Sequence, residues 1–124
     1  VQTCALPISL DPAGNLYTCT RPNVGLAPFS PYTPANIEAQ GYLKDSNQGE
    51  ADYADIPSLI SVMNAPLDGS YAANVRARVN VDQFLRYIAV LSLVGYGETA
   101  IGSDGAPDDY TLYRGALGRL PEAG

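Results

Sequence analysis

The chain has 124 residues, of which 46% are hydrophobic, 13 are acidic and 7 are basic, giving a formal net charge of −6. This length suits one small domain, and the acidic balance argues against nucleic acid or an anionic membrane as the partner. The sequence contains no histidine, which excludes imidazole metal sites and Ser-His or Cys-His mechanisms. Catalysis would have to use carboxylates, hydroxyls, Tyr, Lys or Arg.

The first predicted element is a strand at 15–20, where alternation places Tyr17 and Cys19 on one face. Four prolines make 21–34 irregular. A short strand is expected within 37–43, and a polar loop follows it. These strands lie far apart in sequence from the one predicted near the end of the chain.

Two short helices are predicted next. The first runs from Asp55, which we interpret as the N-cap, to about Asn64. Its apolar residues follow a helical period, with Ile56, Leu59, Ile60 and Met63 on one stripe. The second helix is expected at 70–79.

The central helix is predicted over 80–94. Asn80 and Gln83 have the spacing of a capping box, and Gly95 follows the last apolar residue. In its second half, 88–94, only Ser92 is polar, so we expect this half to be buried on every side. The stretch is too short to span a membrane, which takes about 20 apolar residues.

An acidic, glycine-containing loop follows this helix and leads into a strand predicted at 109–114. The inventory predicts an α+β fold, mainly three helices with a few short strands. A two-stranded ribbon is marginal alone, so we interpret 9–124 as a partial domain that lacks N- and C-terminal parts.

Residues 1–8, VQTCALPI, resemble the conceptual translation of a common short-read sequencing adapter. On this interpretation they are an artefactual leader, Cys19 is a lone thiol and the true N-terminus is missing. The alternative is a genuine apolar N-terminal strand.

Several segments, taken in order, resemble the CotH kinase family, which is named for a spore-coat protein kinase with an atypical kinase-like fold. They are GNLY (14–17), EADYADI (50–56), VDQFLRYIAV (81–90), ET (98–99), DDY (108–110) and LYRG (112–115). The helix followed by D-Y-x-L-Y is the specific part. The resemblance implies a piece of a kinase-like C-lobe.

The resemblance also implies site residues. Glu98 matches the position of the family's catalytic acid, and Asp109 matches a metal-binding Asn. Asp108 is a second candidate metal ligand, and Gly102 and Gly105 would let the backbone approach a nucleotide. Both Glu98 and Asp109 depart from the commoner family residues. The structural alternative is a solvated loop carboxylate for Glu98 and turn residues for the two aspartates.

The implied function is transfer of the ATP γ-phosphate to Ser or Thr hydroxyls of a protein, with Mg²⁺. The fragment itself is expected to be inactive, because the family's downstream D-x-D and its ATP-contacting lysine match nothing in the chain. The competing hypothesis is a non-catalytic CotH-like surface or adhesion module. Family members are often bacterial and act at the cell surface or in a coat layer.

Overall fold

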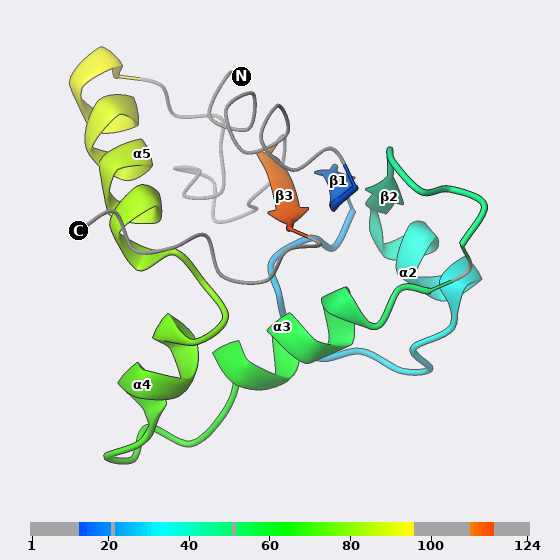
Figure 1. The fold of residues 1–124 in the computed structure, drawn as a ribbon, viewed down its shortest axis with the longest axis horizontal. Coiled ribbons are helices and arrows are strands. Elements are labelled where there is room, and N and C mark those ends of the chain that lie inside the picture. The colour runs from blue at the N-terminus through cyan, green and yellow to red at the C-terminus, as the bar shows by residue number, and fades with distance from the viewer. Residues whose placement is uncertain (1–12, 21, 51, 96–109, 116–124) are drawn as a thin grey trace.

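The computed structural model describes residues 13–20, 22–50, 52–95 and 110–115. Its elements, in chain order, are β1 (Asn15–Cys19), α2 (Pro34–Gln40), β2 (Tyr42–Lys44), α3 (Asp55–Met63), α4 (Tyr71–Arg76), α5 (Val81–Val94) and β3 (Tyr110–Arg114) (Figure 1). Four helices and a small antiparallel sheet among the described residues confirm the predicted α+β class.

The sheet has the strand order β2-β1-β3, with β1 in the centre. β1 pairs antiparallel with both neighbours, so that Tyr17 lies opposite Lys44 on one side and Leu112 on the other. At its ends β1 places Asn15 opposite Arg114 and Cys19 opposite Tyr110 in β3. β1 and β3, which lie far apart in sequence, therefore pair with each other.

The segment before β2 differs from the prediction, because it forms helix α2. Thr33 is its N-cap, and the Thr33 hydroxyl accepts a hydrogen bond from the Asn36 backbone N–H at 3.3 Å. Pro34 occupies the first helical position, where its missing N–H costs little. Gly41 ends the helix with φ of 112°, a left-handed conformation that favours glycine.

Helix α3 lies where it was predicted, but its N-cap is Ala54 and not Asp55. Asp55 is the first helical residue, and its side chain makes no cap bond. Ile56 and Ile60 are each 1% exposed, which confirms this part of the predicted stripe, but Met63 at its end is 36% exposed. Helix α4 is shorter than the predicted 70–79 and buries no residue.

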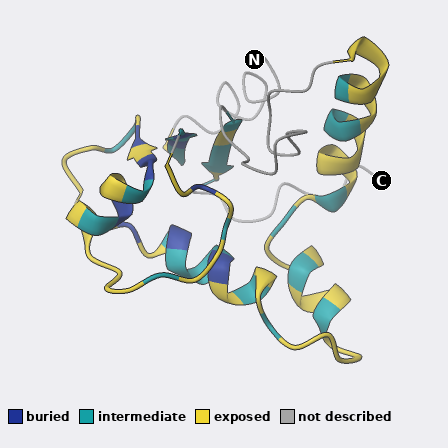
Figure 2. Ribbon diagram, turned by 180° about the vertical axis from the view of Figure 1, so that it is seen from behind, coloured by how far each residue is buried: buried dark blue, intermediate teal, exposed yellow. Residues whose placement is uncertain are grey.

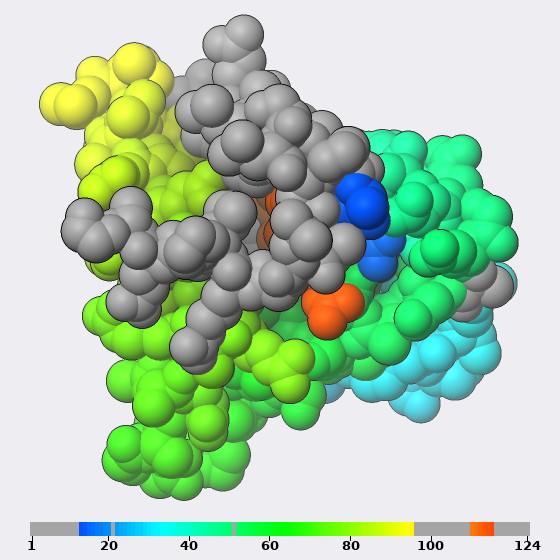
Figure 3. All heavy atoms as spheres, viewed as in Figure 1, coloured from blue at the N-terminus to red at the C-terminus, as the bar shows by residue number. Residues whose placement is uncertain are grey.

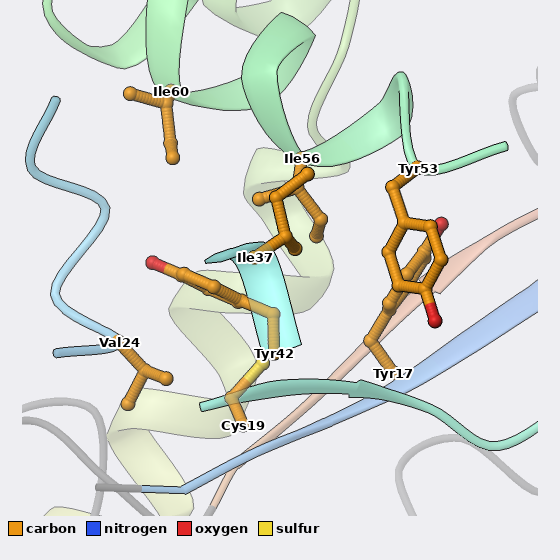
Figure 4. Packing of buried hydrophobic residues seen from close by; sticks show 8 residues of the cluster. All are labelled: Tyr17, Cys19, Val24, Ile37, Tyr42, Tyr53, Ile56 and Ile60. Carbon is orange, nitrogen blue, oxygen red and sulfur yellow. The ribbon is translucent and has the colours of Figure 1, made fainter. Parts of the chain in front are cut away.

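The core joins the sheet to α2 and α3. Figure 4 shows the side chains that fill it, with Tyr17 beside Tyr53 and Cys19 below Tyr42. Among the described residues, the fully or almost fully buried apolar ones are Tyr17, Cys19, Val24, Ile37, Tyr42, Tyr53, Ile56 and Ile60. The buried positions in Figure 2 concentrate in this part of the fold and not in α4 or α5.

Helix α5 has the predicted ends. The Asn80 side chain accepts a hydrogen bond from the Gln83 backbone N–H at 3.0 Å, and Gly95 closes the helix with φ of 67°. The predicted burial of its second half is wrong, because no described element covers Leu93, which is 86% exposed. None of the described helices has the length and apolar composition needed to cross a bilayer.

Candidate functional site

The five site residues predicted from the sequence, Glu98, Gly102, Gly105, Asp108 and Asp109, lie outside the described residues. The structure describes the two elements that border them, since α5 ends at Val94 and β3 begins at Tyr110. Within the described ranges, no three Asp, Glu, Cys or His side chains form a group able to hold a metal ion. The structure therefore describes the elements around the predicted site loop and the contacts that hold them in place.

The start of β3 is anchored by Tyr110. Its hydroxyl donates a hydrogen bond to the backbone carbonyl of Val24, and its ring packs against the core. Burial raises the pKa of the Tyr110 phenol well above its usual range, and the nearby Cys19 and Tyr42 raise it further. Tyr110 thus stays neutral and acts as a hydrogen-bond donor, which fixes the first residue of β3 after the candidate loop.

The end of β3 is held by Asp55. The Asp55 Oδ1 atom lies 2.8 Å from Arg114 Nη1, while Oδ2 accepts hydrogen bonds from Asn15 Nδ2 at 2.7 Å and from the Tyr17 hydroxyl at 3.0 Å. Arg114 is 63% exposed and Asp55 only 13%. One carboxylate of α3 therefore contacts both β1 and β3. Figure 3 shows that β3 reaches the surface beside β1.

This contact is possible because Asp55 is not used as a helix cap. Ile56 and Ile60 seat α3 on the sheet, and the first turn of α3 then presents Asp55 to the strands. Burial raises the pKa of the Tyr17 phenol above its usual range, and the Asp55 carboxylate raises it further. Asp55 accepts three donors, so it acts as a structural clamp and not as a free general base.

Lys44 is the only lysine in the chain, and the sequence assigned it no role. It is 5% exposed, and its ammonium donates to the backbone carbonyls of Glu50 at 3.2 Å and Asp52 at 3.0 Å. The same ammonium lies 5.5 Å from the centroid of the Tyr53 ring. These contacts hold the 45–53 loop against β2 and leave Lys44 buried.

Sequence reasoning missed the structural roles of Asp55 and Lys44. The signal for Asp55 was its place in the EADYADI segment, but its partners lie 38–59 residues away in the sequence. The signal for Lys44 was alternation, since in β2 it shares a sheet face with Tyr42. Arg114, at the end of β3, is exposed and paired with Asp55.

In the comparison with protein families, the model of the family described as CotH kinase protein matches residues 8–121, which is most of the chain. No curated protein and no solved structure matches the sequence. The match spans all the segments on which the resemblance depends. The chain belongs to the CotH kinase family.

Proposed function

We propose that this chain is the part of a CotH-like protein kinase that carries its catalytic loop, and that the complete protein transfers the ATP γ-phosphate to Ser or Thr hydroxyls of a protein substrate. The observation that carries this proposal is the family match over residues 8–121, which includes the acidic positions between α5 and β3. Phosphoryl transfer depends on positioning and on electrostatic stabilisation. Both need a rigid support for the loop.

In this proposal Glu98 orients or accepts the proton of the attacking hydroxyl. Asp109, and secondarily Asp108, provide carboxylate oxygens for Mg²⁺, which prefers such ligands. Gly102 and Gly105 let the loop backbone approach the nucleotide phosphates. The described framework supports these roles indirectly, because Tyr110 and Arg114 hold both ends of the strand that follows Asp109.

The 124-residue chain alone is proposed to be inactive. Kinases use a lysine to hold the ATP phosphates, and the single lysine of this chain, Lys44, is buried with its ammonium bonded to two backbone carbonyls. Lys44 cannot reach a nucleotide without breaking both bonds. A lysine that holds the ATP phosphates would therefore have to come from outside these residues.

A binding module is the second candidate. The observation that favours it is the pair of departures from the commoner family pattern, Glu98 and Asp109. If these substitutions abolish catalysis, the fold would serve as a cell-surface or adhesion module. The two proposals differ in whether the complete protein labels a Ser or Thr hydroxyl in the presence of ATP and Mg²⁺.

The roles of the two acids are tested in the complete protein by Glu98→Gln and Asp109→Ala. Loss of a general base lowers kcat by about 10²–10⁴-fold, so Glu98→Gln should lower kcat and leave the Mg²⁺ requirement unchanged. Asp109→Ala should raise the Mg²⁺ concentration needed for half-maximal activity. The control is Asp82→Asn, which removes one negative charge at an exposed position of α5. It should change neither kcat nor the Mg²⁺ requirement. Full activity of both site variants would refute the assigned roles.

A further inference from the structure

A pocket of about 370 Å³ opens where the starts of α2 and α3 come together. Its lining residues are Tyr32, Pro34, Ile37, Asp52, Tyr53, Ala54 and Pro57. Two tyrosines, two prolines and an isoleucine make the walls mostly apolar. Such walls suit the aliphatic part of a side chain, and a few polar groups would then set the specificity.

The charge of this pocket is negative. Among the described residues that line it, Asp52 is the only charged one. A second carboxylate lies at its edge, because Glu38 accepts a hydrogen bond from the hydroxyl of Tyr53. The opposing charge is Lys44, whose buried ammonium lies on the Tyr53 ring and is bonded to backbone carbonyls. Two carboxylates against one ammonium leave a negative site on a chain whose net charge is −6.

The walls are held in place by contacts outside the pocket. The Tyr32 ring packs edge-on against Phe29, with ring centroids 4.7 Å apart. Tyr53 is fixed by Glu38 and by its contact with Tyr17, at 6.2 Å between ring centroids. Asp52 Oδ1 accepts a hydrogen bond from the Ala54 backbone N–H at 2.9 Å. A carboxylate can accept about four hydrogen bonds, so Asp52 keeps capacity for a further donor.

We infer that this pocket binds a lysine or arginine side chain of a partner polypeptide. The aliphatic stem would pack on Pro34 and Pro57, and the cation would meet Asp52 and the Tyr32 ring, which is 42% exposed. Long basic side chains have this division between an apolar stem and a charged end, and aromatic faces attract cations. Charge complementarity favours a basic partner over an acidic one. The inference does not depend on phosphoryl transfer, because it concerns binding alone.

The test measures binding of short peptides to the full chain by ligand-observed NMR. Three peptides differ only at their central residue, which is lysine, norleucine or glutamate. The lysine peptide should bind at least about fivefold more tightly than the norleucine peptide, as expected for one ion pair aided by an aromatic contact. The glutamate peptide should bind most weakly.

Matched variants locate the site. Asp52→Asn retains an oxygen that can accept from Ala54, so it should keep the fold while abolishing the preference for lysine over norleucine. Asp82→Asn removes an equal charge elsewhere and should leave the preference intact. Tyr32→Ala should weaken both peptides, and the lysine peptide more than the norleucine peptide, because it removes the aromatic contact of the cation as well as apolar wall area. Equal affinity for lysine and norleucine, no binding of the lysine peptide, or equal effects of the two aspartate variants would each overturn the inference.

Discussion

The carboxylate of Asp55 and the guanidinium of Arg114 lie 2.8 Å apart and join the start of α3 to the end of β3. The same carboxylate also binds Asn15 and Tyr17 on β1. β3 follows the candidate catalytic loop, and this contact fixes the far end of that strand to the core, while Tyr110 holds the end next to the loop. The framework of the loop therefore depends on residues outside it.

The first prediction concerns this clamp. Asp55→Ala should lower the free energy of unfolding by about 2–4 kcal/mol, because it leaves the Tyr17 hydroxyl and the Asn15 amide without their acceptor. Arg114→Ala should cost less than about 1 kcal/mol, since the arginine is 63% exposed. Urea denaturation of both variants measures the difference. Equal losses would contradict the assignment of Asp55 as the shared acceptor.

The second prediction concerns the other end of β3. Tyr110→Phe removes the hydrogen bond to the Val24 carbonyl, which then lacks a partner from this strand. The expected loss of stability is about 1–2 kcal/mol. Tyr32→Phe is the matched control, because this tyrosine is 42% exposed and should change stability by less than about 0.5 kcal/mol. A Tyr110→Phe variant as stable as wild type would show that the bond contributes nothing.

The third prediction concerns alkaline pH. The hydrogen bond to Glu38, together with burial, raises the pKa of Tyr53 to about 12. In the unfolded chain this phenol titrates near its ordinary pKa of about 10, so the folded state holds the proton more tightly. The resulting stabilisation is complete below about pH 10. It is lost as the pH rises from about 10 to about 12.

Tyr53→Phe is the variant that isolates this effect. The stability difference between wild type and Tyr53→Phe should shrink as the pH rises through that window, as measured by urea unfolding at a series of pH values. Cys19 contributes in the same direction, since burial raises the pKa of its thiol to about 12. A difference that grows with pH would contradict the assigned direction.

The sequence predicted those features that depend on neighbouring residues. The ends of α5 follow from Asn80 and Gly95, and the inward face of β1 follows from the alternation of Tyr17 and Cys19. Helix α2 has equally local signals in Thr33 and Gly41, but the prolines before it pointed to an irregular segment.

Features that depend on distant packing could not be predicted. The clamp at Asp55 joins residues up to 59 positions apart, and nothing in a single sequence identifies such partners. The burial of α5 was predicted from composition, but exposure depends on which elements pack against it, and Leu93 has none among the described elements. The roles of Glu98, Gly102, Gly105, Asp108 and Asp109 stay predictions.

The fourth prediction uses this exposed helix. Leu93→Glu should leave the free energy of unfolding nearly unchanged, because this side chain is 86% exposed. It should reduce self-association, because it places a charge among the exposed apolar residues of α5, which include Val90 and Val94. Ile60→Ala, at a position 1% exposed, should cost about 2–5 kcal/mol. Sedimentation velocity and urea denaturation distinguish the two effects. A large loss of stability in Leu93→Glu would show that this side chain is covered in solution.

The most direct test of the kinase assignment is the transfer of labelled γ-phosphate from ATP by the complete protein, with Mg²⁺ and with a chelator in its place. We expect Mg²⁺-dependent labelling of Ser or Thr hydroxyls that is lost in Glu98→Gln. We expect no labelling by the 124-residue chain alone. A complete, folded protein that labels no hydroxyl under these conditions would contradict the kinase assignment and favour the binding module.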